Sequence, residues 1–315
     1  MSYIYHLAGE NLELAEAELK GFLKSQDCNE IPLREGRIAE TNSEPSQLKR
    51  LALTHEVSRK ICEKNIADIE NLEIDYRPER SFAVRVEDLD DKRDKEEIEN
   101  VLGKLFSSSR NSVDLENPET IIKAYLIDGN VVIGELVESI NRGLYDIRKN
   151  QHRPFSSPVS LDPVLARALI NLSCINPGEK VLDPFCGTGG ILIEAGLCGS
   201  KVRGLDIKEE MCKGCITNLE EYGIINHGIR QGKISEIDEI FEEESKKIIT
   251  DLPYGKSSKQ TEDAVESFLD FIESFDGKVV FVWNEKSIGG YTADFSVYVH
   301  RSLSRHIYVV EGGEK

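Results

Sequence analysis

The second half of the chain alternates short apolar segments with amphipathic helical patterns, and this alternation restricts the fold more than any other feature of the sequence. Apolar segments with strand character occupy residues 180–182, 201–205, 228–231, 246–250 and 278–283, and helical patterns at residues 208–222 and 262–274 fall between them. Strands that alternate with helices form a parallel sheet with helices on both faces. The chain from residue 161 is therefore predicted to be an α/β domain.

Two further strand patterns end the chain, at residues 295–300 and 304–310, and a short turn joins them. Connections this short join antiparallel strands, because parallel strands need a long crossover. An antiparallel pair that closes a parallel sheet distinguishes this layout from the plain dinucleotide-binding arrangement.

The first half of the chain mixes strands and helices in another order. Asp128-Gly129 lies between strand patterns at residues 120–127 and 130–137, which is a strong hairpin signal. Further strands are expected at residues 3–7 and 81–86, and helices at residues 12–24, 46–64 and 92–106. This order predicts a compact α+β region.

Composition limits the classes of function. The chain has 315 residues, which suits two or three domains, and its 57 acidic against 39 basic residues give a formal net charge of −18. Phosphate backbones repel such a protein, which argues against indiscriminate binding to nucleic acid. The chain shows no signal-peptide pattern and no long apolar run. We therefore expect a cytoplasmic protein without membrane segments, with its seven cysteines reduced.

A local exception to the acidic balance lies at residues 141–154. Here Arg142, Arg148, Lys149 and Arg153 stand against a single acidic residue. The sequence pattern also changes at this point, so the stretch is the candidate linker. It is either a solvated connecting segment or a positive surface for nucleic acid.

Residues 181–190, Val-Leu-Asp-Pro-Phe-Cys-Gly-Thr-Gly-Gly, lead from a strand through a glycine turn into a helix. Such a turn brings backbone N–H groups close to a ligand at the helix N-terminus. The third glycine of a dinucleotide site and the Lys-Ser/Thr of a P-loop are both missing. Asp183 at the strand end indicates instead a ligand with a cationic amine. The alternative is a tight strand–helix turn without a ligand.

Two more strands end in residues that suit a ligand. Asp206 is placed to accept hydrogen bonds from ribose hydroxyls, although an acid there also caps helices. Residues 251–255, Asp-Leu-Pro-Tyr-Gly, follow the fourth strand. Ligands bind outside the carboxyl ends of parallel strands, so Asp251 and Tyr254 should face the same crevice as Asp183. A carboxylate and a neighbouring carbonyl can accept hydrogen bonds from a planar amine, and an aromatic ring can stack on the base that carries it.

Residues 181–190 and residues 251–255 resemble the two signature motifs of S-adenosylmethionine-dependent amino methyltransferases. A third segment, residues 153–169, Arg-Pro-Phe-Ser-Ser-Pro-Val-Ser-Leu-Asp-Pro-Val-Leu-Ala-Arg-Ala-Leu, is similar to the entry into the catalytic domain of the archaeal and eukaryotic tRNA methyltransferases that modify N2 of guanosine 10. In that family a THUMP module, an α+β RNA-binding domain, precedes a Rossmann-like methyltransferase domain. The resemblance runs from about residue 153 to the end; before that it rests on the order and size of the elements.

The chain is accordingly expected to divide into four segments. These are an N-terminal α+β segment at residues 1–50, a THUMP-like RNA-binding domain at 51–145, a basic linker at 146–160 and the S-adenosylmethionine-dependent methyltransferase domain at 161–315. The expected partner is tRNA, and a small activating subunit is not excluded.

The resemblance also implies a set of site residues. Asp183, Gly187 and Gly189 would contact the amino acid part of S-adenosylmethionine. The expected cofactor residues are Phe155, Pro158, Ser160, Asp183, Phe185, Cys186, Gly187, Thr188, Gly189, Asp206 and Ile207. The expected catalytic residues are Asp251, Leu252, Pro253 and Tyr254, of which Asp251 and the Leu252 carbonyl would hold the guanine N2 amine. The expected RNA contacts are Arg142, Arg148, Lys149 and Arg153. No metal is expected, because Cys212 and Cys215 lack the second pair of a zinc site.

Two positions depart from the family pattern. Leu252 replaces the first proline of the usual Pro-Pro pair, so the loop loses a rigid residue. Lys233 stands where relatives often carry an acid that accepts from the adenine amine, and a charged lysine cannot accept a hydrogen bond. Ser235 or a backbone group must then take over, or cofactor affinity falls. A catalytically impaired RNA-binding relative stays open as an alternative, as do methyltransferases for ribosomal RNA guanine N2 or DNA adenine N6, and so does one methyl group against two.

Overall fold

The computed structural model describes residues 1–157, 160–241, 245–254, 259–301 and 303–312. The chain divides into two compact units. The first unit comprises residues 1–12, 30–49 and 54–141, and the second comprises residues 13–29, 50–53 and 142–315. Two short pieces of the N-terminal half therefore belong to the second unit, and strands from both sides of residue 50 belong to the first. The THUMP-like identity of residues 51–145 stays a prediction.

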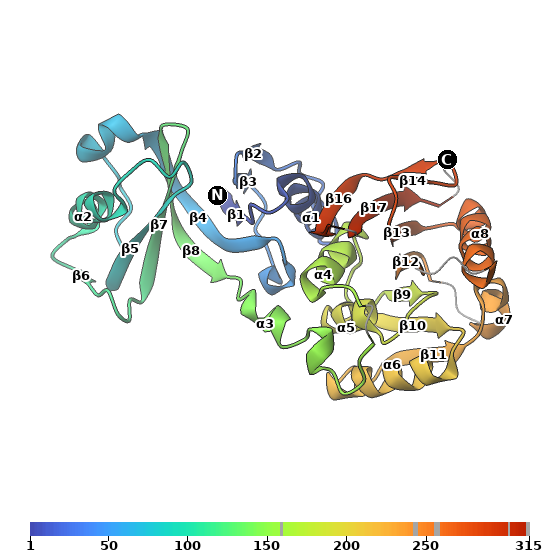
Figure 1. The fold of residues 1–315 in the computed structure, drawn as a ribbon. Coiled ribbons are helices and arrows are strands. Elements are labelled where there is room, and N and C mark those ends of the chain that lie inside the picture. Colours follow the sequence, from blue (N-terminus) through green and yellow to red (C-terminus); the bar gives the residue numbers. More distant parts are fainter. Residues whose placement is uncertain (158–159, 242–244, 255–258, 302, 313–315) are drawn as a thin grey trace. The chain divides into compact units, whose positions relative to one another are not determined.

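The first unit is built on an eight-stranded sheet in the order β2-β3-β1-β4-β8-β7-β5-β6 (Figure 1). Its strands are β1 (Tyr3–Leu7), β2 (Leu33–Glu35), β3 (Ile38–Thr41), β4 (Thr54–Asn65), β5 (Ser81–Asp88), β6 (Ser112–Val113), β7 (Thr120–Ile127) and β8 (Asn130–Ser139). The predicted hairpin is confirmed: β7 and β8 pair antiparallel. Asp128 and Gly129 both have positive φ, 47° and 83°, as the turn of a tight hairpin needs.

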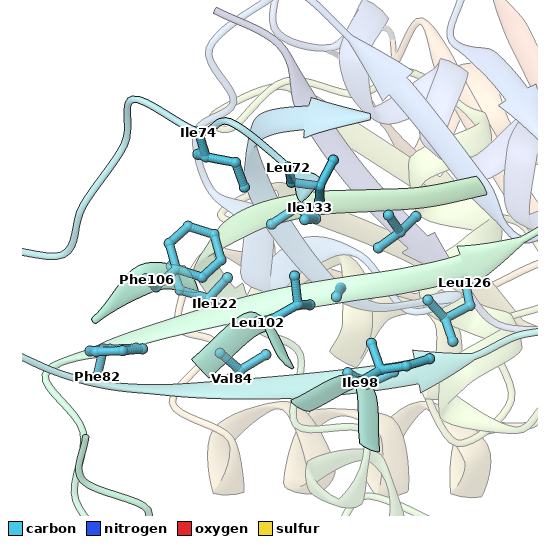
Figure 2. Packing of buried hydrophobic residues seen from close by; sticks show 13 residues of the cluster. Leu72, Ile74, Phe82, Val84, Ile98, Leu102, Phe106, Ile122, Leu126 and Ile133 are labelled. Atoms are coloured by element: carbon cyan, nitrogen blue, oxygen red, sulfur yellow. The ribbon is translucent and has the colours of Figure 1, made fainter. Parts of the chain in front are cut away.

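One apolar layer of the first unit lies between the sheet and helix α2 (Lys95–Phe106). Figure 2 shows Leu102 and Phe106 of this helix packed on Phe82, Val84 and Ile122 of the strands. Alternate residues of a strand point to the same face, which is why Phe82 and Val84 are buried together. The short helix η2 (Ile66–Asn71) borders the same layer.

The helix predicted at residues 46–64 is wrong. The structure has a short turn, η1 (Leu48–Arg50), followed by the long strand β4, which pairs with β1 on one side and β8 on the other. The register against β8 shifts between Val57 and Ser58 and again between Lys60 and Cys62. Each bulge inserts a residue and breaks the period-two pattern, so the apolar spacing imitated a helix.

The second unit contains a seven-stranded sheet in the order β11-β10-β9-β12-β13-β17-β16. Its strands are β9 (Lys180–Asp183), β10 (Lys201–Asp206), β11 (His227–Gln231), β12 (Lys247–Asp251), β13 (Lys278–Trp283), β16 (Phe295–His300) and β17 (Leu303–Glu311). The first five run parallel, while β17 pairs antiparallel with β13 and β16 antiparallel with β17. This confirms the predicted α/β class with a terminal antiparallel pair. Between β13 and β16, β14 (Ser287–Ile288) and β15 (Tyr291–Thr292) form a separate small pair.

Helices cover this sheet (Figure 1). The helical elements of the second unit are α1 (Leu12–Lys24), α3 (Gly143–Asp146), η3 (Asn150–His152), α4 (Pro163–Leu172), α5 (Gly190–Leu197), α6 (Glu209–Glu221), η4 (Ile234–Glu236), α7 (Ile237–Ile240) and α8 (Lys259–Ser274), of which α4, α5, α6 and α8 contact the strands. Phe268 and Ile272 of α8 pack on Leu182, Ile248 and Phe281 of the strands. In the part of the chain that the structure describes, no helix combines the length and the apolar character that a bilayer crossing needs.

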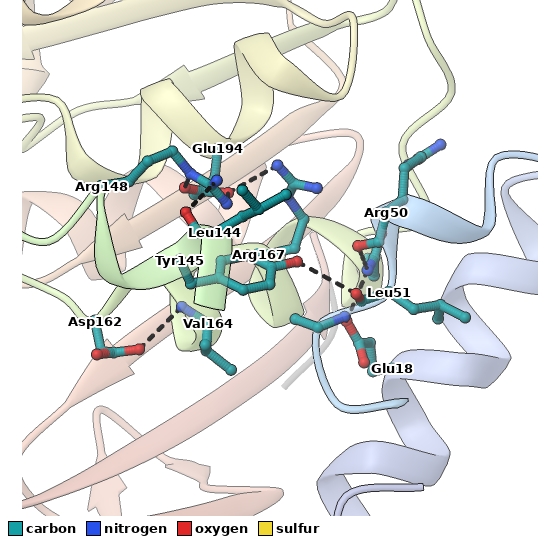
Figure 3. Close-up of polar contacts among 12 residues, drawn as sticks. Glu18, Arg50, Leu51, Leu144, Tyr145, Arg148, Asp162, Val164, Arg167 and Glu194 are labelled. Atoms are coloured by element: carbon teal, nitrogen blue, oxygen red, sulfur yellow. Dashed lines mark hydrogen bonds and ion pairs between the residues drawn. The ribbon is translucent and has the colours of Figure 1, made fainter. Parts of the chain in front are cut away.

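Helix α1 is joined to the second unit by a buried carboxylate. Glu18 accepts hydrogen bonds from the backbone N–H groups of Ala52 and Leu53, both at 2.8 Å, and from Nδ2 of Asn171 on α4, also at 2.8 Å. Burial raises the pKa of Glu18, and these hydrogen bonds oppose the rise. The contact places α1 and residues 50–53 with the helices of the second unit (Figure 3).

Candidate active site

The carboxyl ends of β9, β10 and β12 border a cavity of about 840 Å³. In a parallel sheet these ends meet at one edge, so the residues that follow the strands come together there. The expected site residues that line the cavity are Ser160, Asp183, Phe185, Cys186, Gly187, Thr188, Asp206, Ile207, Asp251, Leu252, Pro253 and Tyr254. The structure therefore gathers all four expected catalytic residues and eight of the expected cofactor residues around one space.

The other three expected cofactor residues are placed differently. Gly189, the residue before α5, is not among the residues that line the cavity. Phe155 packs against α6, where a Cβ on Gly214 would come within 2.1 Å of its ring. Pro158 lies outside the described residues.

The glycine turn between β9 and α5 depends on backbone conformations that other residues rarely adopt. Gly187 and Gly189 have φ of 49° and 84°, in the left-handed region. A Cβ on Gly189 would also lie 2.7 Å from the sulfur of Cys215. The turn can therefore close tightly over α6 only with glycine at this position.

Asp183, at the end of β9, is almost fully buried. Its Oδ1 accepts hydrogen bonds from the Thr250 hydroxyl at 2.6 Å and from the Phe185 N–H at 3.1 Å. Burial raises the pKa of Asp183 to about 7, and the nearby Asp251 and Asp206 carboxylates add to the rise. A cationic ligand would restore the charge balance here, as the sequence predicted.

Asp206, at the end of β10, holds the turn from the other side. Its Oδ1 accepts from the N–H of Lys208 at 2.8 Å and its Oδ2 from the N–H of Gly187 at 3.2 Å. Burial raises the pKa of this carboxyl group. The apolar side chains of Ile207 and Ile234 line the cavity beside it. An acid with an adjoining apolar wall suits a nucleoside, with hydroxyls on one side and a flat base on the other.

Asp251, at the end of β12, has its two carboxylate oxygens in different surroundings. Oδ2 lies 3.6 Å from Nη2 of Arg305, while Oδ1 is buried without a hydrogen-bond partner among the described residues. Burial raises the pKa of Asp251 to about 6, and the Arg305 guanidinium opposes this rise. Leu252 is held by a hydrogen bond from its N–H to the Val282 carbonyl at 3.1 Å. Removing an acceptor from water without a partner is costly, so Oδ1 keeps its capacity to accept a hydrogen bond, on a residue that lines the cavity.

The expected RNA-binding arginines make contacts inside the second unit. Arg148 forms a two-pronged contact with Glu194 of α5, Nε to Oε1 at 2.7 Å and Nη2 to Oε2 at 3.2 Å. Arg167 of α4 binds the same carboxylate at 2.7 Å, and the Tyr145 ring lies under Arg148 at 4.5 Å. Figure 3 shows Glu194 between the two guanidinium groups.

Arg153 is buried. Its Nε donates to the Arg148 carbonyl at 2.9 Å and its Nη1 to the Ser160 hydroxyl at 3.0 Å. Arg142 precedes α3, and Lys149 is half-exposed and pairs with Asp146 at 2.6 Å. RNA contact by these four residues stays a prediction, and the donors of Arg148 and Arg153 point into the protein.

Three residues of the site escaped the sequence analysis. Thr250 holds Asp183, and Asn218 of α6 donates to the carbonyls of Phe155 and Thr188 at 2.8 and 2.9 Å, which ties the entry segment to the glycine turn. Arg305 of β17 reaches Asp251. A charged residue within a strand of mostly apolar residues is the signal that could have revealed Arg305, because a buried charge needs a partner. Among the described residues no group of three His, Cys, Asp or Glu side chains is arranged to hold a metal ion.

Comparison with known proteins agrees with this geometry. A family model described as an RMKL-like methyltransferase domain matches residues 150–279. The tRNA (guanine(10)-N2)-dimethyltransferase of Methanothermobacter thermautotrophicus is 33% identical and aligns with 99% of both chains. The protein of the same name from Pyrococcus abyssi is also 33% identical, over 95% of this chain and 96% of its own.

Among solved structures, TrmN from Thermus thermophilus aligns with 99% of this chain and 100% of its own, with a TM-score of 0.54 at 19% identity, which is a likeness of fold. The full-length matches at 33% identity confirm the family that the motifs predicted. The chain belongs to the family of the archaeal tRNA (guanine(10)-N2)-dimethyltransferases.

Proposed function

We propose that this protein transfers methyl groups from S-adenosylmethionine to the exocyclic N2 amine of guanosine 10 in tRNA. The observation that carries the proposal is the unpartnered, buried Oδ1 of Asp251, a residue that lines the same cavity as Asp183 and Asp206. The names of the full-length relatives support the nucleotide and the product, a dimethylated guanine.

The residues around the cavity fit the proposed cofactor. Asp183 would hold the α-ammonium group, because a buried carboxyl group gains most from a cation. Asp206 would accept from the ribose hydroxyls, and Ile207 and Ile234 would border the adenine. The exposed Lys233 side chain carries no acceptor, but its backbone N–H donates to Glu236 at 2.8 Å and keeps the segment turned toward the cavity. When bound, S-adenosylmethionine supplies a methyl group on a positively charged sulfur.

Asp251 and Leu252 would activate the amine. The lone pair of the guanine amine is delocalised into the ring, so the nitrogen is a poor nucleophile. Two N–H groups donating to Asp251 Oδ1 and to the Leu252 carbonyl would favour a tetrahedral nitrogen and aim its lone pair at the methyl group. The Asp251 carboxylate would stabilise the positive charge that develops on nitrogen and accept the proton that leaves.

Two successive methyl transfers would each need the Asp251 carboxylate as a hydrogen-bond acceptor. After the first transfer the amine still has one N–H, which can donate to Asp251 while the new methyl group takes the place beside Leu252. The Tyr254 ring would pack on the base in both rounds.

The RNA contacts of the linker are proposed for Arg142 and Lys149. Arg148 and Arg153 would instead hold the entry segment on α5 and at Ser160, because their donors are used there. The first unit, with its eight-stranded sheet, would contribute a THUMP-like surface for tRNA.

The proposal is tested with the full chain, labelled S-adenosylmethionine and a tRNA transcript, followed by mapping of the methylated nucleotide. We expect label at guanosine 10 and no label in a transcript with adenosine at that position. Asp251→Asn should lower the rate about 100-fold or more, while calorimetry shows cofactor binding intact. Label in adenine, in another guanosine, or in no tRNA would overturn the proposed function.

A further inference from the structure

Arg305 is a buried, charged residue of the sheet beside the candidate site. It lies on β17, between β13 and β16, and is 6% exposed. Its Nε is buried and has no hydrogen-bond partner among the described residues. A buried guanidinium is costly unless it is paired, so the contacts of the other end of the side chain must explain its presence.

All these contacts converge on one nitrogen and on the catalytic segment. Nη2 donates to the Tyr254 hydroxyl at 3.1 Å and to the Ser160 carbonyl at 3.4 Å, and it lies 3.6 Å from Asp251 Oδ2. The guanidinium therefore contacts both the loop after β12 and the segment that enters α4. On the Asp251 carboxylate it is nearest to Oδ2 and not to the unpartnered Oδ1.

We propose that Arg305 is a positioning residue that keeps Asp251 ionised with Oδ1 directed to the substrate amine and fixes the Tyr254 ring by its hydroxyl. The inference rests on the proposed function, since it assigns a task to Arg305 in the same reaction. Arg305 lies outside the sequence motifs, the last of which covers residues 251–255.

The electrostatic argument depends on what else faces Asp251. The charged and titratable groups that border the same cavity are Asp183 from β9, Asp206 and Lys208 from β10 and the turn after it, Lys233 after β11, Lys259 and Asp263 from α8, and Tyr254 from the same loop. Burial raises the pKa of Asp251, and Arg305 is the group that lowers it. Without Arg305, the effect of burial on the Asp251 pKa would be unopposed, which favours the neutral form of the carboxyl group.

The division between the two oxygens serves catalysis. Because Arg305 faces Oδ2, Oδ1 keeps its full capacity as an acceptor. A guanidinium bound to both oxygens would compete with the amine. The Tyr254 contact likewise uses the hydroxyl and leaves the ring face for the base.

The test compares the pH dependence of kcat/KM for tRNA in Arg305→Gln, Arg305→Lys and Tyr254→Phe. Removing an opposite charge at this distance shifts a pKa by about 1–3 units. We therefore expect the acid limb of Arg305→Gln to move to higher pH by about one unit or more, with activity partly recovered at high pH. In Arg305→Lys the acid limb should stay close to its position in the wild type, while kcat should be lower. Tyr254→Phe should lower kcat without moving the acid limb of the pH profile. Arg301→Gln, an exposed arginine just before β17, is the matched control and should behave as wild type.

A direct titration separates this inference from the proposed function. Carboxyl-labelled aspartate, with Asp251→Asn to assign the signal, reports the Asp251 pKa by NMR without any RNA. A higher titration midpoint in Arg305→Gln supports the inference even if no tRNA is methylated. An unmoved midpoint, or equal kcat and pH profiles for Arg305→Lys and wild type, would overturn it. If Arg305→Gln does not fold, the Arg305→Lys and Tyr254→Phe comparisons decide.

Discussion

Asp183 and Asp251 end neighbouring strands, and their carboxyl groups differ in their partners. Asp183 is fixed through Oδ1 by a hydroxyl and a backbone N–H, and among the described residues no arginine opposes the effect of burial on its pKa. Asp251 is opposed by Arg305 and ionises at lower pH. Near neutral pH, Asp183 therefore still holds part of its proton while Asp251 is mostly charged.

Cofactor binding should release protons. The pKa of Asp183 is raised to about 7 in the folded protein, so at pH 6.5 most of this carboxyl group is protonated. An ammonium group bound beside it favours the charged form and lowers the pKa, so a proton leaves as the cofactor binds. Calorimetry of S-adenosylmethionine binding at pH 6.5, in buffers with different ionisation enthalpies, measures this release.

Asp183→Asn is the control for this measurement. It keeps an oxygen acceptor for Thr250 and Phe185 but cannot release a proton, and its affinity for the cofactor should be lower. At pH 8.5 the wild type should also release almost none, because Asp183 is then already ionised. Equal binding enthalpies in all buffers at pH 6.5 would contradict the role assigned to Asp183.

At the level of the elements, a buried ion cluster joins three helices. Glu194 of α5 lies between Arg148, which follows α3, and Arg167 of α4. One carboxylate serves two arginines, and the Tyr145 ring covers the cluster. Part of the positive charge at residues 141–154 therefore serves internal packing, since Arg148 pairs with Glu194.

Glu194→Gln should destabilise the protein by about 3–5 kcal/mol, because it leaves the buried Arg167 and the partly buried Arg148 guanidinium groups without a counter-charge. The free energy of unfolding in urea measures the effect. Glu209→Gln removes an exposed carboxylate that pairs with Lys213 on α6 and should leave the unfolding midpoint where it is. Equal effects of the two substitutions would show that the cluster is not structural.

For the whole molecule, the net charge of −18 limits where RNA can bind. A field of this sign repels tRNA over most of the surface, so binding must use local positive groups. Replacing Arg142 and Lys149 by alanine together should lower tRNA affinity. It should also flatten the dependence of log K on log salt by about one unit for each phosphate that the protein no longer binds.

The matched control for this prediction is Lys213→Ala. Lys213 is an exposed lysine paired with an acid on its own helix, as Lys149 is paired with Asp146. Its removal should leave the salt slope unchanged. Cofactor binding should stay as in the wild type in both variants. A slope that does not change in the double variant would place the RNA contacts elsewhere.

The second unit is incomplete without residues from the start of the chain. Glu18 and Gly21 of α1 pack on α4, where a Cβ on Gly21 would lie 2.2 Å from the Asn171 carbonyl. A fragment of residues 146–315, the sequence-based linker and methyltransferase domain, lacks this helix. It should unfold at lower temperature than the full chain and bind S-adenosylmethionine more weakly. A fragment with full-length stability and affinity would contradict this division into units.

Much of the fold could be predicted because its signals are local. The strand ends at Asp183, Asp206 and Asp251 were placed from apolar segments and motifs within a few residues, and the structure brings all three to one cavity. The strand β4 was missed because its bulges depend on the partner strand β8. The internal contacts of Arg148 could not be read from the linker alone, because its partner Glu194 is 46 positions away.

The sequence by itself determined the alternation of strands and helices, the glycine turn and the position of the segment at residues 251–255 after a strand, since each depends on residues close together along the chain. Only the tertiary structure decided which charges are buried and what they face. Arg305 meets Tyr254 across 51 positions and Ser160 across 145. The energy of a charge depends on its surroundings in space, and those surroundings exist only once β17 has paired with β13.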